Sequence, residues 1–214
     1  MNFIDISPVI NESIGVFPGD VPFKRSITLD FKKGGNLLLS SIESTLHLGA
    51  HTDAPNHYDK SGASMDQRSL SYYLGKVQII EAKSKAKDLR LRVSDFTDQI
   101  CAPRVLFKTL SYPDPNNFHS HFMSFSPELV DYLAQKKVLL AGIDTPSIDP
   151  ANDNNLSSHK RIFFHDMAIL EGVVLKDVLP GIYTLLALPL KIKNADASPV
   201  RAILIEDGGK SLWT

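Results

Sequence analysis

The segment from His47 to His57 is the sequence feature that most limits how this chain can fold. Its eleven residues read HLGAHTDAPNH and contain three histidines and one aspartate. These polar residues stand at positions 47, 51, 53 and 57, and alternate side chains of an extended chain share a face. Gly49 and Pro55 argue against a helix here. Imidazole and carboxylate are ligands of zinc where no thiolate is offered, so the pattern predicts a metal site. The alternative is a turn-rich loop with surface histidines.

Size and charge narrow the classes of function. With 214 residues the chain fits one domain, 1–214, with a proper core. The formal net charge of −1 gives no indication of a nucleic acid or a membrane surface as a partner. The N-terminus lacks the basic start and apolar run of a signal peptide, and no apolar stretch approaches the ~18 residues of a membrane span. We therefore expect a cytoplasmic enzyme.

Cys101 is the only cysteine, which leaves neither an intramolecular disulfide nor a thiolate metal cage. It lies among apolar neighbours, and we expect a small, buried side chain without a catalytic role.

Hydrophobic patterning predicts about nine strands and two or three short helices, a strand-rich α/β domain. A hairpin is predicted from strands at 24–31 and 37–43, and its second strand leads directly into the histidine segment. The other strands are expected at 3–6, 77–82, 104–110, 138–143, 183–191 and 200–206. The helices are expected at 93–96 with Ser94 as its cap, at 126–135 with Ser126 as its cap, and at 159–167.

Two residues of the second half are further metal candidates. Glu171 has apolar neighbours, and an ionised carboxylate in such a run needs a partner, either a metal or a salt bridge. His159 alone is ambiguous, but with Glu171 and the histidine segment it completes a set large enough for two metal ions. His119 and His121 lie in a polar loop, and we interpret them as surface or lid residues.

The sequence resembles the metal-dependent cyclase superfamily and, within it, the bacterial arylformamidases (kynurenine formamidases). The signature H-x-G-T-H-x-D-x-P-x-H is matched at His47, Gly49, His51, Asp53, Pro55 and His57. Further similarity lies in segments 17–20, 142–147, 158–159, 169–171, 187–190 and 196–202. The resemblance implies a cyclase-like swivelling β/β/α fold and a homodimer.

The resemblance also implies a site for two zinc ions in each subunit. His47 and His51 would bind the first ion, and His159 would bind the second. Asp53 and Glu171 would contact both ions. Manganese or cobalt could take the place of zinc at such ligands.

The implied activity is hydrolysis of N-formyl-L-kynurenine to L-kynurenine and formate, in tryptophan degradation by the kynurenine pathway. A hydroxide that bridges the two ions would attack the formyl carbon, and His57 would be the acid/base that passes a proton to the anilinic nitrogen. Phe17 falls where the family usually has a tryptophan that lines the aryl part of the substrate pocket.

Two departures from the family pattern keep alternatives open. The signature threonine is replaced by Ala50, and Phe17 loses the area and N–H donor of tryptophan. The substrate could therefore be another aryl or cyclic amide, such as an isatin-like lactam. The remaining alternative is a metal-binding homologue without catalytic activity.

Overall fold

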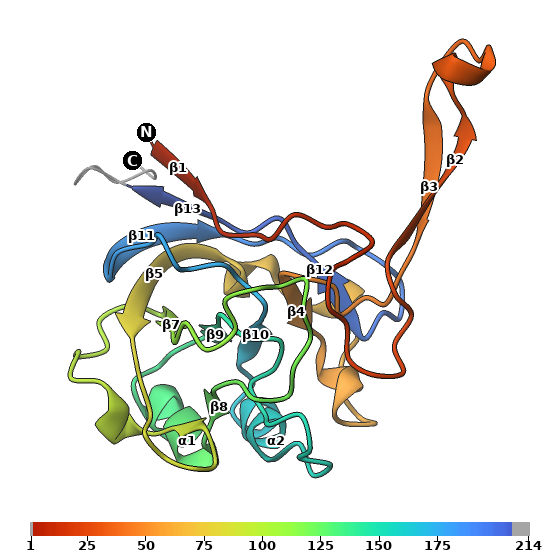
Figure 1. The fold of residues 1–214 in the computed structure, drawn as a ribbon. Coiled ribbons are helices and arrows are strands. Elements are labelled where there is room, and N and C mark those ends of the chain that lie inside the picture. The colour runs from red at the N-terminus through yellow and green to blue at the C-terminus, as the bar shows by residue number, and fades with distance from the viewer. Residues whose placement is uncertain (1, 207–214) are drawn as a thin grey trace.

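A computed structural model describes residues 2–206 of the chain, so residues 1 and 207–214 of the predicted domain lie outside the described residues. Within that range a mixed sheet of seven strands forms the centre of the molecule (Figure 1). In spatial order the strands are β1 (Asn2–Asp5), β13 (Ile203–Glu206), β11 (Gly181–Leu186), β5 (Leu74–Glu81), β7 (Arg104–Lys108), β9 (Leu140–Ile143) and β10 (Ala168–Leu170).

The two halves of this sheet differ in strand direction and in burial. From β1 to β5 the neighbours are antiparallel, and from β5 to β10 they are parallel. Every residue of β7, β9 and β10 is buried, as expected for parallel strands that are covered on both faces. The parallel half therefore lies inside the core of the fold.

Two helices, α1 (Pro127–Gln135) and α2 (Ser157–Phe164), pack against each other beside the parallel strands (Figure 1). Leu129 and Leu133 of α1 and Ile162 of α2 join the buried cluster that covers one face of the sheet. α1 begins as predicted, because the Ser126 hydroxyl accepts a hydrogen bond from the backbone N–H of Leu129. α2 begins two positions earlier than predicted, which places His159 in its first turn.

Three two-stranded pairs complete the described sheets. They are β4 (His51–Asp53) with β12 (Ala197–Pro199), β2 (Lys24–Leu29) with β3 (Leu39–Glu43), and β6 (Arg90–Leu91) with β8 (Ser124–Phe125). Short 3-10 turns cover Phe31–Lys33, Pro55–His57, Met65–Gln67, Leu70–Tyr72 and Val93–Asp95. The strand-rich α/β class is as predicted, but the short strands β4, β6, β8, β10 and β12 were not expected.

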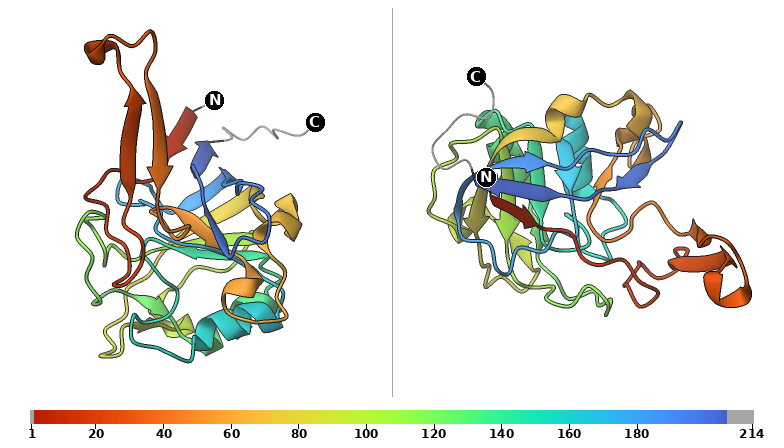
Figure 2. Two further views of the ribbon diagram at one scale, coloured as in Figure 1. Left: turned by 90° about the vertical axis from the view of Figure 1, so that its right-hand side faces the viewer. Right: turned by 90° about the horizontal axis from the view of Figure 1, so that it is seen from above.

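The predicted hairpin is present, and it projects from the body as an arm that consists of β2, β3 and the residues between them (Figures 1 and 2). Every residue of both strands is exposed. The arm therefore buries little apolar surface within its own chain.

Two local predictions are wrong. The segment at 93–96 forms a 3-10 turn that Arg92 precedes, and the Asp95 carboxylate accepts the Arg92 backbone N–H, so Ser94 is not the cap. Cys101 is exposed and not buried, and its backbone N–H donates to the side-chain oxygen of Gln78. No helix within residues 2–206 has the length and apolarity required to cross a membrane.

Candidate metal centre

The histidine segment reaches its geometry through a bent backbone, and not through the single extended chain that alternation suggested. Only His51–Asp53 forms a strand, β4, while Gly49 has a left-handed φ of +57° and Pro55–His57 form a 3-10 turn. β4 pairs with β12 on one side. On its other side His51 exchanges two backbone hydrogen bonds with Glu171, of 3.1 and 2.9 Å. This bridge brings the second half of the chain to the histidine segment.

The first group of candidate ligands consists of His47, His51 and Asp53. One nitrogen or oxygen atom from each lies within 4.8 Å of the others. Asp53 Oδ1 is 2.9 Å from His47 Nδ1 and 3.5 Å from His51 Nε2. We call the space between them the outer position.

The second group consists of Asp53, His159 and Glu171, and their ligand atoms also lie within 4.8 Å of one another. His159 Nε2 is 3.3 Å from Asp53 Oδ2 and 3.7 Å from Glu171 Oε1. We call this space the inner position. Glu171 Oε2 is also 3.2 Å from His51 Nε2, so both carboxylates face both groups. The structure thus brings together all five residues that the sequence analysis named as ligands.

The burial of these side chains shows that they suit a cation. Asp53 and Glu171 are each 2 % exposed. Asp53 Oδ1 is buried and makes no hydrogen bond within residues 2–206, although His47 lies close to it. Buried carboxylates without compensation are costly. Three imidazoles and two carboxylates in one pocket form a donor set that divalent zinc, manganese or cobalt accepts.

The pKa values of the histidines also indicate that this pocket favours a positive charge. Burial by itself would lower the pKa of His47, but Asp53, Asp196 and Glu171 outweigh it and raise the pKa to about 9. Burial likewise opposes the charge on His159, but Asp149, Asp53 and Glu171 raise its pKa to about 10. The carboxylates therefore favour cations in this pocket strongly enough to overcome desolvation.

His57 lies beside these ligands and forms a third, more exposed group with His47 and Asp196, whose ligand atoms also lie within 4.8 Å of one another. Its electrostatics differ from those of His47 and His159. Its ring centroid is 4.2 Å from that of His47 and 6.2 Å from that of His159. Burial lowers the pKa of His57, and the positive charge of His47 and His159 adds to this shift, while the negative charge of Asp53 and Glu171 opposes it without reversing it. Near pH 7 this imidazole is neutral and can accept a proton.

The structure adds two carboxylates that the sequence analysis did not include in the site. Asp149 Oδ2 lies 2.8 Å from His159 Nδ1, and Asp196 Oδ2 lies 3.1 Å from His47 Nε2. Each stands behind a candidate ligand, on the ring nitrogen that faces away from the carboxylates of the site. The similarity of segment 196–202 to the family was the only sequence signal near Asp196, and spacing alone gave none for Asp149.

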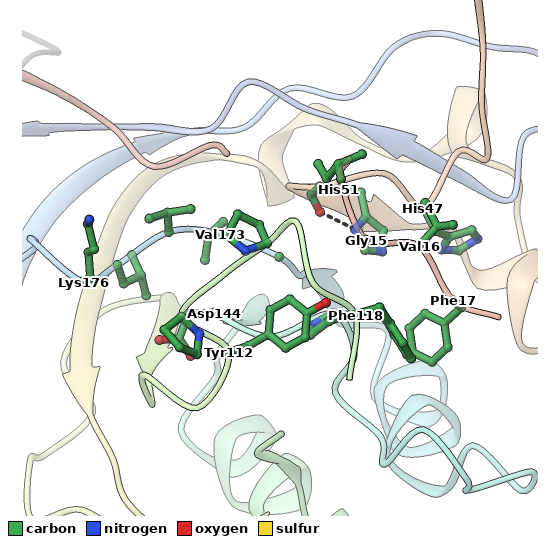
Figure 3. Close-up of a pocket in the computed structure, with 18 of the residues that line it drawn as sticks. Gly15, Val16, Phe17, His47, His51, Tyr112, Phe118, Asp144, Val173 and Lys176 are labelled. Atoms are coloured by element: carbon green, nitrogen blue, oxygen red, sulfur yellow. Dashed lines mark hydrogen bonds between the residues drawn. The ribbon is translucent and has the colours of Figure 1, made fainter. Parts of the chain in front are cut away.

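An apolar pocket adjoins the metal candidates. Figure 3 shows His47 and Phe17 at one end of this pocket and Lys176 at the other. Tyr112 and Phe118 form much of its wall, and the rings of Phe17 and Phe118 are 4.9 Å apart. Phe17 also lines the cleft that holds the metal candidates. It therefore lies between the two spaces, where a substrate ring could contact it.

His119 and His121 do not join the metal candidates. The His119 ring packs against Tyr112 at 4.7 Å, and His121 is exposed. This placement agrees with their interpretation as surface or lid residues.

Comparison with known proteins shows what this architecture is similar to. A family model described as putative cyclase matches residues 4–150. A solved potential metal-dependent hydrolase with cyclase activity is 28 % identical, with a TM-score of 0.77 over 95 % of this chain and 96 % of that one. A predicted metal-dependent hydrolase from Bacillus stearothermophilus is 29 % identical, with a TM-score of 0.77 over 95 % and 97 %.

Isatin hydrolase A from Ralstonia solanacearum shares the fold, at 23 % identity and a TM-score of 0.79 over 96 % of this chain and 92 % of that one. These likenesses confirm the cyclase-like fold that the sequence analysis expected.

Proposed function

The chain belongs to the putative cyclase family, and from this premise we propose that it is an arylformamidase that hydrolyses N-formyl-L-kynurenine to L-kynurenine and formate. One observation carries the proposal. Five candidate ligands converge on two adjoining positions, and an apolar pocket with aromatic walls opens beside them. A metal centre of this kind suits the carbonyl of an amide, and the aromatic wall suits an aryl group.

We propose that His47, His51 and Asp53 hold one divalent cation, and that Asp53, His159 and Glu171 hold a second. Zinc fits these ligands best, and manganese or cobalt would also be accepted. When bound, such cations make water a better nucleophile at neutral pH and polarise a carbonyl group.

His57 is the proposed acid/base. It lines the same cleft as the ligands, and its lowered pKa leaves it neutral near pH 7. In the reaction the oxygen of water adds to the formyl carbon, and His57 takes up the proton that water releases. As the C–N bond breaks, His57 returns this proton to the anilinic nitrogen, which leaves as a neutral amine. The acyl product is formic acid, which keeps the added oxygen and releases the second proton of water to become formate.

A second candidate substrate is a cyclic aryl amide such as isatin. The fold likeness to isatin hydrolase A favours this alternative. Phe17 keeps it open, because the resemblance to the arylformamidases implies a tryptophan at this position. Both substrates carry an aryl ring on the nitrogen of the amide that is attacked, so the same cleft and acid/base would serve either.

The test is a comparison of substrates with protein of known metal content. Purified protein would be stripped of metal, loaded in turn with zinc, manganese and cobalt, and assayed with N-formyl-L-kynurenine, formanilide and isatin. We expect formate release from the formyl compounds, with N-formyl-L-kynurenine giving the highest kcat/KM. Opening of isatin at a higher kcat/KM would favour the lactam, and metal uptake without turnover of any amide would indicate a non-catalytic homologue.

We also propose that the protein is a homodimer, in which the arm of each copy packs on the other copy. Seven large apolar side chains of the arm are exposed: Ile27, Leu29, Phe31, Leu37, Leu38, Leu39 and Ile42. An isolated two-stranded hairpin is marginally stable in water, so a surface of this kind needs a partner. The body carries an apolar groove lined by Pro8, Val9, Ile10, Leu186, Leu188 and Leu190. A second copy of the chain can cover both surfaces at once through a two-fold axis.

A further inference from the structure

We propose that Asp149 is a positioning residue that fixes the His159 ring so that Nε2 faces the inner position. The inference rests on the proposed metal site. It concerns a residue that contacts no other candidate ligand and that acts only through His159.

The hydrogen bonds of Asp149 define the orientation of this ring. Asp149 is 1 % exposed, and its Oδ2 lies 2.8 Å from His159 Nδ1. The same oxygen accepts the backbone N–H of His159 at 3.0 Å. One carboxylate therefore holds the ring relative to its own backbone. Because a carboxylate only accepts, Nδ1 must carry a proton. Nε2 is then the nitrogen that faces Asp53 and Glu171, and it is the one that a bound cation would use in place of its proton.

Asp149 is itself held on both oxygens. Its Oδ1 accepts from Arg90 Nη1 at 3.1 Å, and both oxygens lie 3.0 Å from the backbone nitrogen of Ser158. The carboxylate therefore has a fixed plane and cannot turn away from His159.

The start of α2 explains why a distant residue takes this role. Leu156 stands at the N-cap position with a left-handed φ of +50° and offers no side-chain cap. Asp149 accepts the free N–H groups of Ser158 and His159 in its place. The Asp149 side chain thus caps the N-terminus of α2 and also orients the candidate ligand His159 that α2 carries.

A carboxylate behind a ligating imidazole has two effects on a metal site. It selects the tautomer that leaves the facing nitrogen free, and it makes that nitrogen a stronger donor. Loss of such a partner commonly reduces metal affinity 10- to 100-fold. The effect should be confined to the inner position, because Asp149 touches neither His47 nor His51.

The experiment compares Asp149→Asn with Asp153→Asn. Asp153 is a matched control, since its carboxylate also pairs with Arg90, at 2.6 Å, and accepts from Ser157, but it makes no hydrogen bond with His159. Metal-free protein would be titrated with Co²⁺, followed by calorimetry and by visible absorption. We expect Asp149→Asn to weaken one of two binding steps by roughly 10- to 100-fold and to leave the other unchanged. Asp153→Asn should keep both steps.

The inference is overturned if Asp149→Asn binds both equivalents as the unaltered protein does, or if Asp153→Asn loses the same step to the same extent. If the unaltered protein takes up no metal, the proposed function fails as well, so the two failures are distinguishable. Should Asp149→Asn not fold, the ¹⁵N NMR spectrum of the zinc-loaded, unaltered protein shows which ring nitrogen of His159 carries the proton. A proton on Nδ1 of His159 supports the inference, and a proton on Nε2 contradicts it.

Discussion

Within the site, His57 has a lowered pKa, while His47 and His159 have raised pKa values. This difference assigns separate tasks to similar side chains, since a neutral imidazole can take a proton from water. We predict that His57→Asn lowers kcat about 10²- to 10⁴-fold with metal content unchanged. Metal analysis beside steady-state kinetics checks this. His165→Asn, at a histidine that pairs with Asp131 outside the cleft, is the control and should keep kcat. Loss of metal from His57→Asn would make His57 a ligand.

Metal uptake by the metal-free protein should release protons at pH 7. His47 and His159 have pKa values raised to about 9 and about 10, so each ring carries a second proton, and with it a positive charge, at that pH. A ligating imidazole must be neutral, and binding therefore displaces one proton from each ring. The apparent metal affinity should rise as the pH increases from 7 towards the raised pKa values. Calorimetry in buffers of different ionisation enthalpy measures the protons released, and His159→Asn should release about one fewer. Equal heats in all buffers would contradict the prediction.

At the scale of elements, the site depends on the close approach of β4 and the residues after β10. Gly49 and Gly172 both have left-handed φ values, +57° and +65°. A Cβ atom at position 172 would lie 2.1 Å from the Gly49 carbonyl oxygen. Only glycine at 172 therefore lets the backbone bridge between His51 and Glu171 close.

We predict that Gly172→Ala destabilises the protein by about 2–4 kcal/mol, because it combines left-handed strain with a backbone overlap. Gly34→Ala is the matched control. Gly34 has a φ of +80° and no atom within 4 Å of an added Cβ, so it should lose only about 1–2 kcal/mol from strain. Urea denaturation of both variants measures the difference. Equal losses would show that the contact with Gly49 does not matter.

The elements also show what a sequence can predict. The helix at Pro127–Gln135 has a serine cap and a proline in its first turn, and the strand Leu140–Ile143 is a continuous apolar run. Both carry local signals strong enough to predict. β4, β6, β8 and β12 are two or three residues long and exist only through their partners, so no local period marks them.

The candidate site divides in the same way. The histidine segment and Glu171 could be predicted from residue type, spacing and resemblance to a family. Alternation predicted the correct residues on the assumption of an extended chain, but a left-handed glycine and a 3-10 turn take the place of that chain. Asp149 and Asp196 could not be found, because each meets its histidine only through the tertiary fold.

At the scale of the whole molecule, the sequence of the arm does not predict what the arm contacts. Turn residues and alternation predicted a hairpin, but they do not say which surface covers it. The arm leads through a short link into His47, since β3 ends at Glu43. A partner that held the arm would thus also fix one entry to the cleft.

We predict that the protein is a dimer at micromolar concentration and that Ile42→Asp raises its dissociation constant about 100-fold, which corresponds to ~3 kcal/mol. Ile42 is 70 % exposed on the arm, so a charged side chain there costs little in the monomer. In the dimer the same charge would be buried in the interface without an opposite charge to pair with. Leu179→Asp is the control, because Leu179 is 74 % exposed and belongs to neither the arm nor the apolar groove. Analytical ultracentrifugation across a concentration series measures both constants. A monomeric unaltered protein, or equal weakening by the two substitutions, would contradict the role assigned to the arm.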